Sequence, residues 1–296
     1  MMVARNWKIL FFVVCFWIPL TLSAQDTAPS ELTIDEPTTE QFRQSGESLD
    51  VTYSYNDDNP SAMAIRLIDG SGAAARFDFD DSGYDGGNSQ KTVTLSLSQA
   101  DSGEVADGTT YNIELQATDT VGNSSTASGT DLLTIDDTAP ADLTLDAPAT
   151  EQLRQSTGSL DVTYSYTDNN PSAMAIRLID AGGTAARFDV DDSGYAGGGS
   201  GKTVTLSLSS PDSGSVASGT TYDIELTATD GAGNSSSVTG TDLLTIDDSA
   251  PADLTLDAPA TEQLRQSTGS LDVTYSYTDN NPSAMAIRLI DAGGTA

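Results

Sequence analysis

Residues 49–55 read Leu-Asp-Val-Thr-Tyr-Ser-Tyr, with apolar and polar residues alternating along the whole stretch. Successive side chains of a β-strand point to opposite faces, so this segment has one apolar face and one polar face. Residues 63–67, 93–97 and 111–117 repeat the same period of two. These four stretches therefore predict antiparallel strands that each turn one face to a core.

Three shorter segments, residues 31–35, 74–79 and 131–135, lie between clusters of Gly, Asn, Asp, Ser and Pro that favour turns. No stretch has the 3.6-residue period of a convincing amphipathic helix. Seven short strands within 111 residues predict an all-β chain of immunoglobulin-like (Ig-like), seven-stranded antiparallel β-sandwiches.

A tyrosine near the start of the sixth strand supports this fold. Residues 108–111 read Gly-Thr-Thr-Tyr, and Ig-like folds place a tyrosine here whose hydroxyl bonds back to the preceding corner. We predict this bond for Tyr111 and for Tyr222. The alternative is that both are ordinary core aromatics.

The chain is a tandem repeat with a period of 111 residues. Asp-Thr-Ala-Pro at 26–29 returns at 137–140, and as Asp-Ser-Ala-Pro at 248–251; residues 248–296 differ from 137–185 at a single position. We predict repeat 1 at 26–136, repeat 2 at 137–247 and a truncated repeat 3 at 248–296. Because so short a third repeat cannot close a core alone, we expect an N-terminal fragment of a longer protein.

The first 24 residues resemble an export signal. A basic start carrying Arg5 and Lys8 precedes an apolar run at 9–22, and Ser23 and Ala24 are small. We predict a signal peptide at 1–24, cleaved after Ala24. The alternative is a membrane anchor, but a spanning helix needs about 20 apolar residues. The expected location is therefore extracellular, at the cell surface.

Composition restricts the function. The chain has no His, and its only Cys, Cys15, lies in the predicted signal, so Ser/His, Cys/His and histidine-zinc chemistry are unavailable. The predicted mature chain has 10 basic and 44 acidic residues, a net charge of −34. Such a charge repels nucleic acid and suits hard cations such as calcium. We predict no enzymatic activity, no nucleic-acid partner and no membrane span in the mature fragment.

Each repeat begins Asp-Thr/Ser-Ala-Pro, and both full repeats contain Gly-Thr-Thr-Tyr, Ala-Thr-Asp and Gly-Asn before ending Leu-Thr-Ile-Asp. These units resemble the tandem bacterial Ig-like and cadherin-like repeats of large surface adhesins, over residues 26–296. The resemblance implies an exported, rod-like array in which calcium stiffens the joints.

The predicted topology offers a calcium site independently. In this sandwich the chain enters at the pole that carries the loop between strands two and three and the loop between strands six and seven. Calcium takes six to eight oxygen ligands, and all three segments are acidic or amide-rich. The predicted ligands are Asp26, Asp57, Asp58, Asp119 and Asn123 in repeat 1; Asp136, Asp137, Asp168, Asn169, Asn170, Asp230 and Asn234 in repeat 2; and Asp247, Asp248, Asp279 and Asn280 in repeat 3.

The acidic loops can also be interpreted without a bound ligand. Asp, Asn and Gly are common turn formers, so the same residues can serve as turns alone. Residues 78–83 have the Asp-x-Asp-x-Ser-Gly spacing that begins a helix-loop-helix calcium site, but position 12 is Ser89 instead of Glu, which favours an acidic hairpin loop. Residues 197–203 resemble a phosphate-binding loop, but a strand follows instead of a helix.

Three functional hypotheses follow. The first is the stalk of a surface adhesin, whose partners are the neighbouring repeats and, through an unseen distal domain, a glycan or protein of a host surface or biofilm. The second is a glycan- or protein-binding module, for which Tyr84 and Tyr195 are the expected exposed aromatics. The third is a set of accessory repeats in a larger secreted enzyme.

Overall fold

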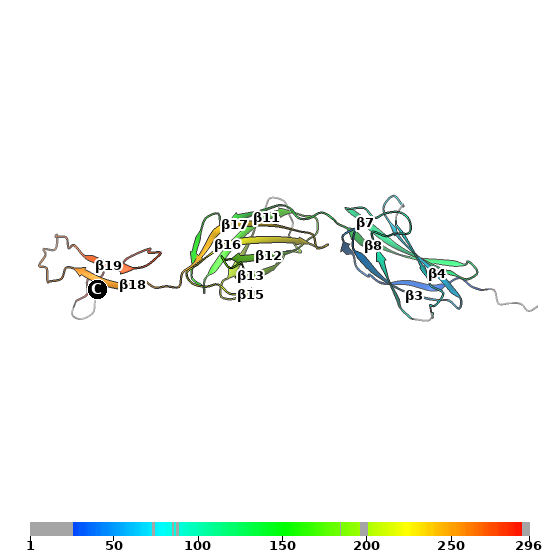
Figure 1. Cartoon of the computed structure of the whole chain (residues 1–296), viewed down its shortest axis with the longest axis horizontal. Coiled ribbons are helices and arrows are strands. Elements are labelled where there is room, and N and C mark those ends of the chain that lie inside the picture. The colour runs from blue at the N-terminus through cyan, green and yellow to red at the C-terminus, as the bar shows by residue number, and fades with distance from the viewer. Residues whose placement is uncertain are drawn as a thin grey trace, which may run out of the picture.

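The computed structural model describes residues 26–72, 75–84, 86, 89–183, 185–195 and 201–291, in which every regular element is a β-strand. The predicted signal peptide lies outside these residues. Within them no helix is long and apolar enough to cross a membrane. The repeats follow one another end to end (Figure 1).

Repeat 1 is a sandwich of two sheets. One sheet has the order β1-β3-β6, and the other has the order β2-β8-β7-β4-β5. All of their pairs are antiparallel except β2 with β8, which is parallel. The strands are β1 (Ser30–Glu36), β2 (Gln41–Arg43), β3 (Ser48–Asn56), β4 (Pro60–Ile68), β5 (Arg76–Asp80), β6 (Lys91–Ser96), β7 (Thr109–Asp119) and β8 (Ser124–Ile135). The predicted all-β, Ig-like sandwich is therefore confirmed.

The structure adds one strand and lengthens another. The seven predicted strands omit β2, because three residues are too few to display a period. Strand β8 begins at Ser124, seven residues before the predicted segment, since its first half is Ser, Thr, Ala and Gly without large apolar residues. Asp131 has a positive φ of 51° within this strand. Its N–H bonds to Oδ1 of Asn112, 2.9 Å away, beside a register shift between β7 and β8.

Repeat 2 reproduces this architecture. Its sheets have the orders β14-β11-β9 and β10-β17-β16-β12-β13-β15. The strands are β9 (Ala141–Ala147), β10 (Gln152–Arg154), β11 (Ser159–Thr167), β12 (Pro171–Ile179), β13 (Ala186–Asp191), β14 (Lys202–Ser207), β15 (Ser213–Gly214), β16 (Thr220–Asp230) and β17 (Ser235–Ile246). In repeat 3, β18 (Ala252–Ala258) pairs with β19 (Thr274–Thr278).

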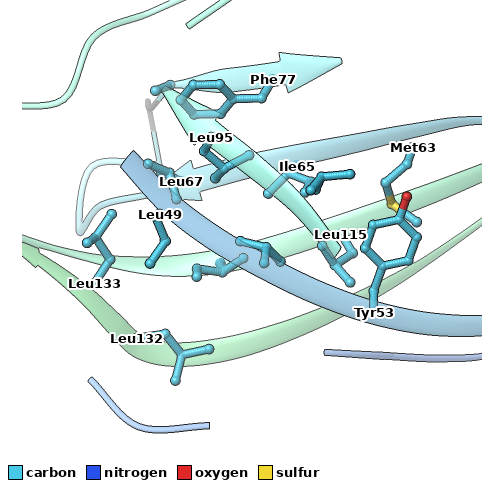
Figure 2. Packing of buried hydrophobic residues seen from close by; sticks show 14 of the residues in the cluster. Leu49, Tyr53, Met63, Ile65, Leu67, Phe77, Leu95, Leu115, Leu132 and Leu133 are labelled. Atoms are coloured by element: carbon cyan, nitrogen blue, oxygen red, sulfur yellow. The ribbon is translucent and has the colours of Figure 1, made fainter. Parts of the chain in front are cut away.

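Each full repeat has its own hydrophobic core. In repeat 1, side chains such as Tyr53, Ile65 and Leu115 are completely buried between the two sheets (Figure 2). A second, separate cluster occupies the same positions of repeat 2. The predicted tyrosine bond is present in both, because the N–H of Ala106 donates to the Tyr111 hydroxyl and the N–H of Ala217 to Tyr222, each at 2.8 Å.

The chain enters and leaves each repeat at opposite ends. At the N-terminal pole, the Asn123 side chain after β7 donates to the Asp26 carbonyl at 3.1 Å. The N–H of Thr120 there reaches the carbonyl of Asn59, in the loop after β3, at 2.9 Å. At the C-terminal pole, β8 ends beside β2. This arrangement sets the C-terminal pole of one repeat against the N-terminal pole of the next.

Candidate cation site and joint between repeats

The N-terminal pole of repeat 2 gathers carboxylates from three segments. Asp136 precedes β9, Asp168 follows β11 and Asp230 ends β16. Asp136 and Asp230 are buried, and Asp168 is half-buried. A pocket of about 160 Å³ at this pole is lined by Asp136, Asp168 and Asn169 together with Thr138, Ala139, Ala141 and Thr167. The structure thus brings together the three segments that the sequence predicts to converge.

Asp230 organises its own loop. Its Oδ1 accepts from the N–H groups of Ala232 and Asn234 at 2.9 and 2.8 Å, and its Oδ2 accepts from Nδ2 of Asn234 at 2.8 Å. The Asn234 side chain also donates to the Asp136 carbonyl at 2.8 Å. Much of the charge on Asp230 is therefore already met by N–H donors.

The carboxylate of Asp136 is held in a similar way. Its Oδ1 accepts from the N–H of Thr138 at 3.0 Å, and its Oδ2 accepts from Nδ2 of Asn170 at 3.1 Å. In repeat 3, Asn281 makes the same bond to Asp247 at 3.0 Å. Hydrogen bonds from Asn281 and Ser249 lower the pKa of Asp247. In repeat 1, Asn59 donates instead to Asp26, the counterpart of Asp137, at 3.3 Å. Asn59 and Asn281 are absent from the predicted set.

The carboxylate of Asp168 accepts fewer hydrogen bonds than those of Asp136 and Asp230. Burial raises its pKa, the N–H of Asn170 opposes the rise, and the negative charges of Asp230 and Asp136 add to it. Its equivalent Asp57 behaves alike, because burial and the charges of Asp119, Asp26 and Asp58 raise its pKa against one hydrogen bond from Asn59. Oδ2 of Asp57 is buried and has no hydrogen-bond partner. These two carboxylates are the ones that a cation would stabilise most.

Asp119 shows the opposite balance at the same pole of repeat 1. Burial alone would raise its pKa, but hydrogen bonds from Asn123, Val121 and Gly122 outweigh burial and leave the pKa below its ordinary value. Like Asp230, Asp119 mainly holds its own loop by accepting hydrogen bonds, and it is less available as a cation ligand.

Several predicted ligands lie elsewhere. Asp137 turns back to repeat 1, where its Oδ1 accepts from the N–H of Ser45 at 2.8 Å and its own N–H reaches Asp107 at 2.8 Å. Asp248 turns back to Ser156 in the same way, at 2.9 Å. Asp58 and Asn280 have exposed side chains. Asn169 is also exposed but lines the pocket, and Oδ1 of Asp279, the counterpart of Asp168, caps the N–H of Asn281 at 2.7 Å.

The oxygen donors at the N-terminal poles form a mixed set. Among the described residues, no group of three or more Asp, Glu, His or Cys side chains could hold a metal ion by itself. At each N-terminal pole two carboxylates remain, one of which has few hydrogen-bond partners. Amide and carbonyl oxygens lie beside them. Calcium accepts such mixed oxygen ligands with water, so the residues present are compatible with it.

Repeats 1 and 2 also touch directly. Nε2 of Gln44 donates to Oδ1 of Asn234 at 2.6 Å. The ring of Phe42 lies against Gly231, where a Cβ atom would come within 3.3 Å of it. An open cavity of about 560 Å³ lies beside this contact, lined by residues of both repeats such as Gly46 and Gly233. The joint is therefore anchored at a few points and leaves space around them.

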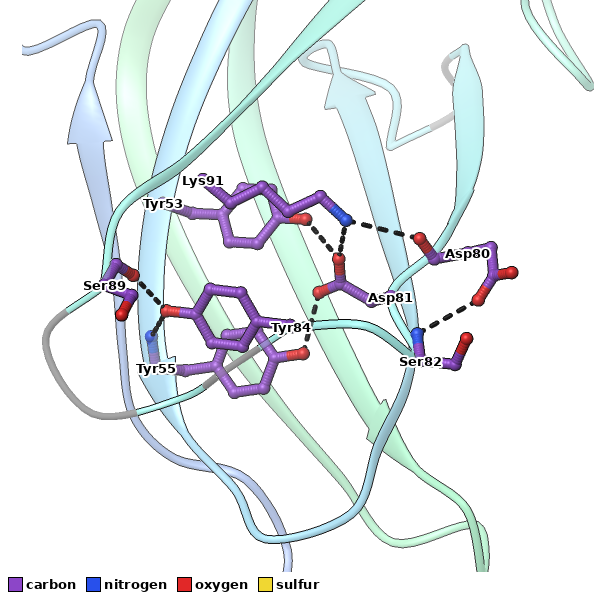
Figure 3. A network of polar contacts seen from close by, with 8 residues as sticks. All are labelled: Tyr53, Tyr55, Asp80, Asp81, Ser82, Tyr84, Ser89 and Lys91. Atoms are coloured by element: carbon purple, nitrogen blue, oxygen red, sulfur yellow. Dashed lines mark hydrogen bonds and ion pairs between the residues drawn. The ribbon is translucent and has the colours of Figure 1, made fainter.

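Each full repeat contains a buried polar cluster, and Figure 3 shows that of repeat 1. Asp81 is fully buried and accepts from the hydroxyls of Tyr53 and Tyr55 at 2.8 and 2.7 Å, and Lys91 forms an ion pair with it. Tyr84 stacks on Tyr55 with ring centroids 4.3 Å apart. Asp192 and Lys202, with Tyr164, Tyr166 and Tyr195, repeat the arrangement in repeat 2.

This cluster corrects one expectation, the exposure of Tyr84 and Tyr195, and agrees with the hairpin-loop interpretation of residues 78–83. Tyr84 is 7% exposed and Tyr195 stacks on Tyr166 at 4.5 Å, so neither is the exposed aromatic that a glycan site would use. In the acidic loop, Asp80 caps Ser82 at 3.0 Å and Asp78 pairs with Arg76 at 2.8 Å, as in a hairpin loop. Lys202 is engaged by Asp192, and residues 196–200 of the phosphate-loop resemblance lie outside the described residues.

No protein family and no curated protein matches the chain. Among solved structures, it is similar to the fibronectin(III)-like modules of Clostridium thermocellum CbhA, with 13% identity, coverage of 73% of this chain and 94% of that chain, and a TM-score of 0.40. A chimeric titin Z1Z2 carrying a KLER exogenous peptide from decorin has 13% identity, 74% and 99% coverage and a TM-score of 0.31. Titin A168169 has 14% identity, 73% and 99% coverage and a TM-score of 0.26.

Proposed function

We propose that these repeats form a non-enzymatic stalk in an exported bacterial surface adhesin, which holds a distal binding domain away from the cell. The observation that carries the proposal is the joint, in which the C-terminal pole of repeat 1 contacts the N-terminal pole of repeat 2 through Gln44 and Phe42. Similar units joined end to end give a quasi-one-dimensional rod. The partners are then the neighbouring repeats and whatever surface the distal domain binds.

Charge is the main obstacle to a straight array. Repeats 1 and 2 carry 21 acidic against 4 basic and 16 acidic against 4 basic residues. Their like charges repel each other. The repulsion is weaker in physiological salt, where the screening length is about 8–10 Å. A cation at each joint removes repulsion where the repeats are closest.

We place calcium at the N-terminal poles. In repeat 2 Asp168 and Asp136 would hold it, and in repeat 1 Asp57 and Asp26, with carbonyl oxygens and water completing the ligands. The supporting observations are the unpartnered buried Oδ2 of Asp57 and the raised pKa of Asp57 and Asp168. Bound calcium would neutralise these carboxylates and fix the loops that meet the preceding repeat.

Thermal unfolding of residues 25–296 in calcium and in chelator tests the cation. A ligand at 100 times its dissociation constant adds about 2.7 kcal/mol to the free energy of unfolding. Asp168→Asn should abolish the calcium response of repeat 2, and in chelator it should stabilise that repeat because it removes a poorly solvated charge. The matched control is Asp161→Asn, since Asp161 is exposed on β11 and accepts from Thr205. Equal calcium responses in both variants would refute the assignment.

A further inference from the structure

The loop after β7 in repeat 1 and the loop after β16 in repeat 2 share a backbone but differ in two side chains. Residues 119–123 read Asp-Thr-Val-Gly-Asn, and residues 230–234 read Asp-Gly-Ala-Gly-Asn. In each loop the N–H of the fourth residue bonds to the carbonyl of the first at 3.3 Å. The fourth residue has a positive φ in both loops, 94° at Gly122 and 89° at Gly233, which explains why both are glycine.

The other glycine of this loop in repeat 2, Gly231, is not required by the backbone. Thr120 holds the same place in repeat 1, where its N–H bonds to the carbonyl of Asn59 at 2.9 Å. Gly231 makes the same bond to Asn170 at 2.7 Å. Neither Thr120 nor Gly231 has the positive φ that favours glycine. This turn therefore accepts a side chain, and the glycine of repeat 2 has another cause.

The ring of Phe42 in repeat 1 supplies that cause. A Cβ atom on Gly231 would lie 3.3 Å from Cδ2 and 3.4 Å from Cγ of the Phe42 ring. Carbon atoms pack best at about 3.5–4.0 Å, so this contact is already tight. A threonine would add a hydroxyl and a methyl group to the same Cβ atom. Glycine therefore leaves the space into which repeat 1 places the ring.

The next position of the loop is covered in repeat 2 and open in repeat 1. Ala232 is 7% exposed, whereas its counterpart Val121 is 66% exposed. Among the described residues, the hydrophobic cluster of repeat 2 does not include Ala232, which instead lines the cavity beside the joint together with Phe42 and Gly46 of repeat 1. The preceding repeat therefore provides the cover.

We propose that Gly231 and Ala232 form a socket that admits the ring of Phe42, and that Thr120 and Val121 close the same position in repeat 1. The partner of the socket is the C-terminal pole of a preceding repeat. The N-terminal pole of repeat 1 takes no such partner, either from its own chain or from a second copy. Two side chains thus decide which poles can be joined.

The closed pole limits how copies of the chain can associate. Head-to-tail contacts between separate copies generate open filaments when they do not close into a ring. Leu153, at the place of Phe42 in β10, is 45% exposed and offers the apolar side chain for such a contact. Without a socket on repeat 1, a second copy cannot receive it there. The meaning of this limit for an array rests on the proposed stalk function, but the socket itself does not.

Thiol reactivity of residues 25–296 in chelator measures the cover directly. Residues 26–296 contain no Cys, so Ala232→Cys and Val121→Cys each place one thiol in loops of the same backbone. Ala232→Cys should react with a water-soluble thiol reagent about tenfold more slowly, because a covered group reacts only while its cover is open. Adding Gly231→Thr should raise its rate to that of Val121→Cys. The matched control adds Thr120→Gly to Val121→Cys and should leave the rate unchanged.

Two further measurements assign the effect to the ring. The free energy of unfolding of repeat 2 in urea should not fall in Gly231→Thr, since repeat 1 carries threonine in the same turn. Phe42→Ala should also raise the rate of Ala232→Cys, and adding Gly231→Thr to Phe42→Ala should raise it no further, because both changes remove one contact.

Equal rates for Ala232→Cys and Val121→Cys would show that repeat 1 does not cover the loop. An unchanged rate after Gly231→Thr, or a loss of stability of repeat 2 in that variant, would show that the glycine does not serve the ring. Each of these results overturns the socket. Because the thiol reports contact at one position, a joint that bends around this contact would still pass, so failure of the stalk proposal is distinguished from failure of the socket.

Discussion

Gln44 in repeat 1 donates a 2.6 Å hydrogen bond to Asn234 in repeat 2, across 190 positions of sequence. This bond joins the loop after β2 to the loop after β16, so it couples the C-terminal pole of repeat 1 to the N-terminal pole of repeat 2. We expect Gln44→Ala to increase the range of orientations between the two repeats and to change the free energy of unfolding of either repeat by less than about 1 kcal/mol. Residual dipolar couplings measure the first quantity and urea unfolding the second. Gln155→Ala, at the corresponding position of repeat 2, is the control that should leave this joint unchanged.

The tyrosine that closes the corner before β16 should contribute measurably to stability. Tyr222→Phe keeps the buried ring but leaves the N–H of Ala217 without its 2.8 Å partner. A net hydrogen bond contributes about 1 kcal/mol, so the free energy of unfolding of repeat 2 should fall by about that amount. Urea denaturation followed by tyrosine fluorescence measures it. No loss in Tyr222→Phe, or in Tyr111→Phe of repeat 1, would mean that the tyrosines act only as core aromatics.

Two neighbouring aspartates should differ sharply. Asp192 is fully buried and serves Tyr164, Tyr166 and Lys202, whereas Asp191 is exposed and caps Ser193 at 3.0 Å. Asp192→Ala should destabilise repeat 2 by about 3–5 kcal/mol, because it leaves the Lys202 ammonium and two tyrosine hydroxyls without their carboxylate partner. Asp191→Ala, with the same change of charge, should cost about 1 kcal/mol or less. Similar losses in the two variants would show that the buried cluster is not a stabilising unit.

The tyrosine clusters also predict loss of stability at alkaline pH. Burial, followed by hydrogen bonding to Asp81 or Asp192, raises the pKa of Tyr53, Tyr55, Tyr164 and Tyr166 well above the ordinary value near 10. A group with a raised folded pKa stabilises the fold fully below its unfolded pKa and loses that contribution as pH rises towards the folded pKa. Above about pH 10 each such tyrosine should therefore remove about 1.4 kcal/mol per pH unit.

Stability measured between pH 9 and 11 checks this slope. Tyr164→Phe should make the decline of repeat 2 shallower, since Phe does not ionise. A slope unchanged by this substitution would show that the Tyr164 hydroxyl titrates alike in the folded and unfolded states.

The alternation in residues 49–55 and in the three similar stretches allowed the sandwich to be predicted, because each of these strands turns a continuous apolar face to the core. Strand β2 could not be predicted in this way. Its three residues are defined by a parallel partner about 90 positions away, and no local pattern records that pairing.

The candidate site was predictable at the level of segments and not of atoms. Acidic loops at one pole followed from topology, but which oxygens are already satisfied depends on side chains such as Asn59 and Asn281, which look like ordinary turn residues in the sequence. The buried position of Asp81 could not be predicted for the same reason, since an Asp-rich hairpin gives no sign that one carboxylate turns inward to two tyrosines.

The distance between equivalent points on two repeats tests the stalk most directly. Thr94 on β6 and Thr205 on β14 are exposed and correspond across the 111-residue period, so spin labels on Thr94→Cys and Thr205→Cys report the joint alone. Pulsed electron resonance should give one narrow distance distribution in calcium and a broad one in chelator. A distribution that is broad in calcium, or identical in both conditions, would contradict a stalk whose joints are fixed by calcium.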